Sequence, residues 1–190
     1  MKLLEEKILA EGKAENENIL KVDSFINHQV DPMLMEQLGA ELASHFKDCG
    51  VTKVVTIESS GIAPALMTAK ALGVPMIILK KAPSKILNQN LFQTVVTSYT
   101  KGTSYELTIK REFLDPGEKV LFIDDFLASG EAAFGMLRLA KEAGIEVAGI
   151  GIVIEKAFQA GHDRLIGEGI DVYSLARVKS MSENHIEFVD

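Results

Sequence analysis

Apolar runs of strand length alternate with helical patterns along most of this chain, and this alternation constrains its fold more than any other feature. The runs occupy residues 53–57, 75–79, 119–123, 147–154 and 171–178. Most of their residues are apolar on consecutive positions, which is typical of strands that are buried on both faces of a parallel sheet. Helical patterns follow several of these runs, so the sequence predicts an α/β fold in which helices flank a mainly parallel sheet.

Proline and glycine mark the expected helix boundaries. Longer helices are predicted at residues 32–48, 60–72 and 129–142, and shorter ones at 1–12 and 160–169. Pro32 suits the first position of a helix, where its missing N–H costs nothing. Gly73 and Gly144 follow the second and third helices, as expected for residues that end a helix. A short strand is possible at residues 19–22.

Residues 82–113 interrupt the strand–helix alternation. Two β-type segments, 91–100 and 103–113, flank Lys101-Gly102, which indicates a β-rich flap. No repeat and no Pro/Gly/Ser-rich linker divides the chain, so residues 1–190 are predicted to form one domain.

The composition restricts the compartment and the partners. With 47% hydrophobic and 25% charged residues, the chain is typical of globular proteins. The net charge of -7 argues against a nucleic-acid partner, which requires a basic surface. The single cysteine, Cys49, cannot form an intramolecular disulfide, and no stretch approaches the roughly 18 apolar residues of a membrane span. The opening MKLLEEKILAEG builds no apolar signal segment, so we expect a cytoplasmic protein with no membrane partner.

The most informative local pattern is VLFIDDFLASGEAA, residues 120–133. An apolar strand is expected to end at Ile123, two aspartates follow, and a small-residue turn leads into a helix that begins near Ser129. N–H groups at a helix start bind anions, and Gly130 lets the backbone approach a phosphate closely. Two interpretations stay open from the residues alone. The turn is either a phosphate site whose aspartates face sugar hydroxyls or a cation, or ordinary capping chemistry of Asp125 and Ser129.

The same stretch closely resembles the motif with which type I phosphoribosyltransferases bind 5-phosphoribosyl 1-diphosphate (PRPP). That motif consists of an apolar strand, two acidic residues and a Thr/Ser-Gly turn. The wider chain is similar to the xanthine phosphoribosyltransferases, which are purine-salvage enzymes, over nearly all of its length. The stretches that carry this similarity are ESSGIAPA, GVPMIILKKAPSK, SYTKGTSYEL and IEKAFQAGHDRL. Adenine phosphoribosyltransferases share much of this order and are the nearest alternative.

The resemblance implies a type I phosphoribosyltransferase fold in which residues 1–31 form an N-terminal hood and residues 82–113 a flexible flap. It implies that Asp124 and Asp125 are catalytic and face the ribose hydroxyls, directly or through water and Mg²⁺. The PRPP phosphate loop would comprise Ala128, Ser129, Gly130, Glu131 and Ala132. Mg²⁺ keeps several waters and few carboxylate ligands, so it would be carried by PRPP with no direct protein site.

The resemblance also implies a second loop, which binds the diphosphate. Its candidate residues are Ser59, Ser60, Gly61, Lys80 and Lys81. An arginine often occupies the third position of the related loop, where this chain has Ser60. Charge neutralisation would therefore depend on one of the two lysines or on Mg²⁺. Without the resemblance, paired lysines at a strand end indicate a solvated surface.

Further implied residues close the site and read the purine. Ser104 and Tyr105 would belong to the flap that closes over the substrate, although a plain β-hairpin is the alternative. Leu20, Asn27 and Lys156 would contact xanthine. The Lys156 ammonium donates, so it favours a purine with a 6-oxo group over adenine, whose 6-amino group is a donor. Asn27 can both donate and accept, and so could read the second carbonyl of xanthine.

The activity that these expectations describe is the conversion of xanthine and PRPP to xanthosine 5'-monophosphate (XMP) and diphosphate, by a homodimer. Alternatives of the same class are the adenine and the hypoxanthine/guanine phosphoribosyltransferases. An alternative of a different class is a non-catalytic regulator that senses PRPP. Such a regulator would carry a basic DNA-binding module, for which this acidic chain has no room.

Overall fold

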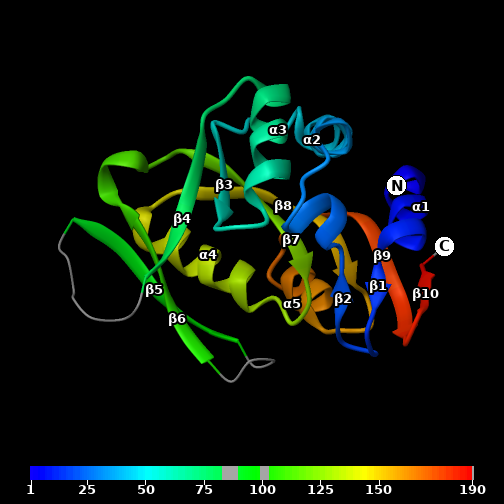
Figure 1. Cartoon of the computed structure of the whole chain (residues 1–190). Coiled ribbons are helices and arrows are strands. Elements are labelled where there is room, and N and C mark those ends of the chain that lie inside the picture. The colour runs from blue at the N-terminus through cyan, green and yellow to red at the C-terminus, as the bar shows by residue number, and fades with distance from the viewer. Residues whose placement is uncertain (83–89, 99–102, 190) are drawn as a thin grey trace.

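An eight-stranded sheet runs through the centre of the computed structural model, which describes residues 1–82, 90–98 and 103–189. The strand order is β10-β9-β8-β7-β3-β4-β6-β5 (Figure 1). The strands are β3 (Lys53–Ile57), β4 (Met76–Ala82), β5 (Leu91–Ser98), β6 (Thr103–Lys110), β7 (Lys119–Leu127), β8 (Glu146–Lys156), β9 (Val172–Ser182) and β10 (His185–Phe188). The central strands β9, β8, β7, β3 and β4 are parallel, whereas β10, β6 and β5 pair antiparallel at the edges. The predicted α/β class with a mainly parallel sheet is confirmed.

Helices cover both faces of this sheet. They are α1 (Lys2–Glu11), α2 (Pro32–Phe46), α3 (Ile62–Leu72), α4 (Glu131–Ala143) and α5 (Gly161–Gly167). Helices α1, α2 and α3 share one apolar core with the face that carries Leu121 and Ile123. Helices α4 and α5 share a second core with the face that carries Phe122 and Ile152. Among the described residues, no helix is both long and apolar enough to cross a membrane.

The N-terminal segment packs beside α2 and against β9. After α1 it forms the short antiparallel pair β1 (Lys13–Ala14) and β2 (Leu20–Lys21), and then the π-helix η1 (Asp23–Asn27). Phe25 and Ile26 of η1 are buried in the same core as α2. The helix expected over residues 1–12 and the strand expected at 19–22 are thus present, each slightly shorter than predicted.

Strand β7 is longer than the sequence indicated. It continues through Asp124 and Asp125 to Leu127, where it pairs with Glu155 of β8, and α4 begins only at Glu131. The prediction placed the strand end at Ile123 because the apolar run stops there. Pairing depends on backbone N–H and C=O groups, and the long neighbour β8 supplies these beyond the last apolar side chain.

Two predictions at the sheet edges were also wrong. The last strand was expected over residues 171–178, but β9 continues to Ser182 and turns back as β10. Polar side chains alternate along this exposed edge and hide its strand character. Strands β5 and β6 of the predicted flap extend the sheet, because β6 pairs with β4 beyond the end of β3. Residues 111–113, expected as strand, form the 3-10 helix η2 (Arg111–Phe113), and residues 83–89 and 99–102 of the flap lie outside the described part.

Candidate active site

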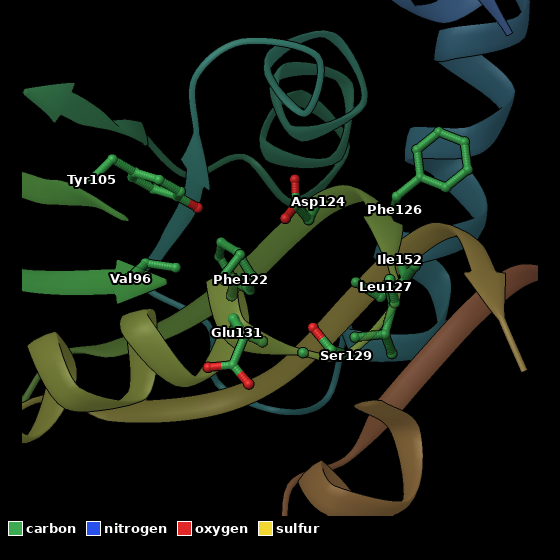
Figure 2. A pocket seen from close by; sticks show the side chains of 13 residues that line it. Val96, Tyr105, Phe122, Asp124, Phe126, Leu127, Ser129, Glu131 and Ile152 are labelled. Carbon is green, nitrogen blue, oxygen red and sulfur yellow. The ribbon is translucent and has the colours of Figure 1, made fainter. Parts of the chain in front are cut away.

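Two adjoining cavities lie at the carboxyl ends of β3, β4 and β7. The first has a volume of about 160 Å³ and the second about 180 Å³. Tyr105, Asp124 and Ala132 line both cavities, so the two form one site. Ligands of open α/β sheets bind at this end of the strands. Figure 2 shows the first cavity, with Tyr105 and Asp124 on one side of the opening and Ser129 and Glu131 on the other.

The loop from Ala128 to Gly130 joins β7 to α4 and lines the first cavity. Gly130 precedes the helix with a φ of 89°, a left-handed conformation that favours glycine. No side chain caps the start of α4. The first N–H groups of a helix have no partner within the helix, and with the helix dipole they favour an anion. The loop and the start of α4 therefore have the chemistry of a phosphate site.

Asp124 and Asp125 are half-buried on β7 next to this loop. The Asp124 Oδ1 atom accepts a hydrogen bond of 3.0 Å from the backbone N–H of Asp125. Burial and the neighbouring charge of Asp125 raise the pKa of Asp124 well above its ordinary value, although Lys81 opposes the shift. A half-buried acid pair of this kind favours ligands that donate hydrogen bonds or carry positive charge.

The second cavity is lined by the β3–α3 turn, which contributes Glu58, Ser59 and Ser60. The Glu58–Ser59 peptide bond is cis. The Glu58 carboxylate accepts hydrogen bonds from the backbone N–H of Lys81 at 2.6 Å and from the Lys80 ammonium at 3.0 Å. These two contacts lower the pKa of Glu58. The turn is thereby fixed to the end of β4.

The structure separates the two candidate lysines. Lys81 lines the second cavity, and its ammonium lies 5.2 Å from the centre of the Tyr105 ring. Lys80 is paired with Glu58 and lines a different cavity, together with Met76 of the same strand. Consecutive residues of a strand point to opposite faces of the sheet, so only one of the two can face the site. Lys81 is that residue.

Gly61 lies behind the acid pair, where the β3–α3 turn meets β7. A Cβ atom at Gly61 would lie 2.5 Å from the Thr56 hydroxyl and 3.1 Å from the Asp124 carboxylate. The missing side chain therefore lets the two predicted loops approach each other. Gly61 shapes the site rather than lining its second cavity.

The two predicted flap residues differ in position. Tyr105 lines both cavities, and burial together with the Asp124 charge raises the pKa of its hydroxyl. Ser104 is exposed and shares a 3.1 Å hydrogen bond with Thr97 across the β5–β6 hairpin. Tyr105 is therefore part of the site in this structure, whereas Ser104 lies outside the two cavities.

None of the three predicted purine contacts lines either cavity. The Lys156 ammonium is 5.5 Å from the ring centre of Phe126, which lines that cavity, and it donates a 2.6 Å hydrogen bond to the Asn18 carbonyl. Burial lowers the pKa of Lys156. Leu20 is buried in the α2 core, and Asn27 is exposed at the end of η1. No sequence pattern indicates the Asn18 contact, since it joins a backbone carbonyl to a residue 138 positions away.

Helix α5 supports the phosphate loop through residues that were not predicted. The backbone N–H of Gly161 donates a 3.0 Å hydrogen bond to the Ala128 carbonyl. Arg164 donates to the Ser129 carbonyl and to Glu131. These residues come from a short helix with few apolar positions, so their role depends on three-dimensional contacts that no local pattern reveals.

Comparison with known proteins bears on this arrangement. The family model described as "Phosphoribosyl transferase domain" matches residues 31–182. The chain belongs to the phosphoribosyltransferase family. Its relatives include xanthine phosphoribosyltransferase of Agathobacter rectalis, which is 56% identical over 190 residues that cover 100% of this chain and 99% of that protein. Xanthine phosphoribosyltransferase 1 of Clostridium botulinum is 56% identical over 189 residues, with 100% of both chains covered.

Solved phosphoribosyltransferase structures share the fold of this chain. Adenine phosphoribosyltransferase of Thermoanaerobacter pseudethanolicus superposes with a TM-score of 0.76 at 22% identity, covering 92% of this chain and 99% of that one. The Giardia lamblia enzyme in complex with 9-deazaadenine gives a TM-score of 0.75 at 22% identity, covering 92% and 97%. The expected type I phosphoribosyltransferase fold is confirmed.

Proposed function

We propose that this chain transfers the phosphoribosyl group of PRPP to N9 of xanthine, which yields XMP and diphosphate. One observation carries the proposal: a cap-free helix start, an acid pair and a lysine meet in one site of a phosphoribosyltransferase fold. The choice of purine is supported by the xanthine phosphoribosyltransferases that share 51–56% of their residues with the chain along nearly its full length. The same reaction class was expected from the VLFIDDFLASGEAA motif.

The phosphoribosyl group fits the first cavity in one orientation. The N–H groups from Ala128 to Ala132 bind the 5'-phosphate, because they surround the start of α4. Asp124 and Asp125 accept hydrogen bonds from the ribose hydroxyls. C1' then points to the second cavity, where the backbone of Ser59 and Ser60 and the Lys81 ammonium bind the diphosphate.

The reaction breaks the bond between C1' and the diphosphate oxygen and forms a bond between C1' and N9. The electron pair of the broken bond leaves with the diphosphate, and N9 of xanthine supplies the new pair while the purine loses one proton. Positive charge develops on the ribose in between. The carboxylates of Asp124 and Asp125 stabilise this charge, since they lie fixed in a poorly solvated site. Tyr105 and the β5–β6 hairpin border the same space and help to exclude water.

The donor set fits a Mg²⁺ ion that is held mainly by the substrate. Among the residues that the structure describes, no group of three or more His, Cys, Asp or Glu side chains could hold a metal. The adjacent carboxylates of Asp124 and Asp125 would offer one or two ligands, which suits an ion that keeps several waters and is carried by PRPP. When bound, the ion would neutralise diphosphate charge.

The purine would lie between the first cavity and the hood. Lys156 stands beside Phe126 and can donate to the 6-oxo group of xanthine. Asn27 is exposed at the end of η1 and, as the family resemblance implies, would read the second carbonyl of xanthine. The family resemblance also predicts a homodimer, which light scattering can test. The single cysteine suits the reducing environment of the cytoplasm.

The purine is tested by diphosphate release with PRPP, Mg²⁺ and each of xanthine, hypoxanthine, guanine and adenine. We expect the highest kcat/KM for xanthine, because a polar group that the bound purine covers but leaves without a partner costs about 1–3 kcal/mol, or roughly ten- to a hundredfold. Adenine should be the poorest substrate, since its 6-amino group faces the Lys156 donor. Turnover with adenine alone would show that Lys156 does not read the base as proposed.

The two lysines at the end of β4 give a matched pair of variants. Lys81→Met should raise the KM for PRPP about tenfold or more, because a charge-assisted contact to the diphosphate is lost and Ser60 brings no charge to replace it. Lys80→Met removes the same charge one residue away, from a side chain that lines a different cavity. Glu58 keeps its 2.6 Å hydrogen bond from the Lys81 backbone N–H, so the turn stays in place and KM should change less than threefold. Equal effects of the two substitutions would contradict the assignment of Lys81.

A further inference from the structure

Glu131 presents an electrostatic problem within the proposed phosphate loop. It is the first residue of α4 and lines the first cavity, and its side chain is only 18% exposed (Figure 2). A carboxylate at a helix start is itself favoured by the free N–H groups and the helix dipole. An unpaired Glu131 would therefore compete with the 5'-phosphate for the same N–H groups and repel its charge.

Arg164 of α5 holds the Glu131 carboxylate. Its Nη1 atom donates a 2.8 Å hydrogen bond to Glu131 Oε1 and a 2.5 Å hydrogen bond to the Ser129 carbonyl. The guanidinium also lies over the Phe134 ring, 4.4 Å from its centre. These three contacts hold the Arg164 guanidinium against the loop, where its positive charge neutralises the Glu131 carboxylate.

Helix α5 is in turn anchored to the sheet. The His162 ring shares a 3.0 Å contact with Glu155, whose carboxylate is 1% exposed. Glu155 also accepts hydrogen bonds from Ser174 and Arg177 of β9. At the start of α5, the backbone N–H of Gly161 donates a hydrogen bond to the Ala128 carbonyl. Arg164 therefore reaches the loop from a support that is fixed independently of Glu131.

We propose that Arg164 is a positioning residue for the phosphoribosyl ligand: it withdraws the Glu131 carboxylate from the start of α4 and so leaves the loop N–H groups free for the 5'-phosphate. This inference rests on the proposed function, because it assumes that the loop binds a phosphate. It gives α5, which lines neither cavity, an effect on ligand affinity that acts through Glu131. It also explains why an acidic residue is tolerated inside an anion site.

The test compares four proteins: the unmodified chain, Arg164→Gln, Glu131→Gln and the double variant. Calorimetry measures their affinity for ribose 5-phosphate, which carries the 5'-phosphate but no diphosphate, and for PRPP with Mg²⁺. Arg164→Gln should weaken the binding of both ligands about tenfold or more. The Glu131 carboxylate, no longer held by Arg164, then repels the 5'-phosphate in a partly buried site, where charges are screened less than in water. The double variant should regain the affinity of Glu131→Gln to within about threefold, because the competing charge is gone.

Two further variants separate this mechanism from a loss of support. Arg164→Lys keeps the charge and should bind both ligands within about threefold of the unmodified chain. Lys141→Gln is the control for net charge. Lys141 lies on α4 about 15 Å from Glu131, so the loss of its charge should leave both affinities unchanged. The midpoint of thermal unfolding should stay nearly the same in the Arg164 variants, since the Arg164 side chain is 42% exposed.

The outcomes are distinguishable. If the double variant stays as weak as Arg164→Gln, Arg164 does not act through Glu131 and the inference is wrong. It is equally wrong if Arg164→Gln binds normally while the unmodified chain binds both ligands. If the unmodified chain binds neither ribose 5-phosphate nor PRPP, the proposed function itself fails.

Discussion

Asp124→Asn is expected to slow phosphoribosyl transfer about a hundredfold or more and, at the same time, to stabilise the folded protein at pH 7. Turnover falls because asparagine still accepts hydrogen bonds from the ribose but no longer offers a negative charge to the cation-like ribose. Stability rises because the Asp124 carboxylate is buried beside Asp125, which raises its pKa above the ordinary value of 3.8. A neutral amide of the same shape removes that cost.

The pH dependence of the gain follows from the sign of this shift. An acid whose folded-state pKa is raised binds its proton more tightly in the folded state, so it destabilises the fold as pH rises above about 4. The stability difference between Asp124→Asn and the unmodified chain should therefore be small near pH 4 and grow until the raised pKa is passed. Each unit of pKa elevation is worth about 1.4 kcal/mol at higher pH. Urea unfolding at several pH values measures the difference.

Asp48→Asn is the control for this substitution. Asp48 is exposed after the end of α2 and lines neither cavity, so the same chemical change there should leave turnover unchanged. A hundredfold loss of turnover without any gain in stability would mean that Asp124 is charged at no cost in the free protein. Unchanged turnover of Asp124→Asn would show that the Asp124 carboxylate takes no part in the reaction.

Gly161→Ala should lower kcat/KM for PRPP about a hundredfold. A Cβ atom at Gly161 would overlap the carbonyl oxygen of Ala128 and lie 3.0 Å from the Gly130 nitrogen. Both are backbone atoms of the phosphate loop, so the loop or α5 must move by several tenths of an ångström. Displacements approaching 1 Å in a positioned site cost about a hundredfold in rate. Steady-state kinetics with varied PRPP measures the effect.

Gly167→Ala provides a control within the same helix. No atom outside the neighbouring residues lies within 4 Å of the position that its Cβ would occupy, so the alanine is accommodated without movement. Kinetics should be unchanged, and alanine favours a helix more than glycine does. If Gly161→Ala retained normal kinetics while its fold was intact, the contact between α5 and the loop would have no functional weight.

The sequence predicted the elements more reliably than their ends. Apolar runs located β3 and β8 closely, because strands buried on both faces carry apolar side chains throughout. The same rule failed at Asp124 and Asp125, which continue β7 with polar side chains. Polar edge strand β10 was missed for a related reason, since an exposed edge does not need apolar residues.

The candidate site divides along similar lines. The resemblance indicated the loop around Gly130 and the acid pair, and the structure brings both together with Tyr105 and one of the two lysines. Which lysine faces the site depends on strand register and could not be predicted. The Arg164 contact with the phosphate loop and the Asn18 carbonyl beside Lys156 arise from distant segments, so only the folded chain reveals them.

The most direct test of the account is product identification with the purified chain, xanthine, PRPP and Mg²⁺. Mass spectrometry and NMR of the product should show N9-linked XMP, formed in equal amount to the diphosphate released. Ribose 5-phosphate should be scarce if the proposed site excludes water from the ribose during transfer. Absence of XMP, or its replacement by ribose 5-phosphate while PRPP is consumed, would contradict the proposed transfer.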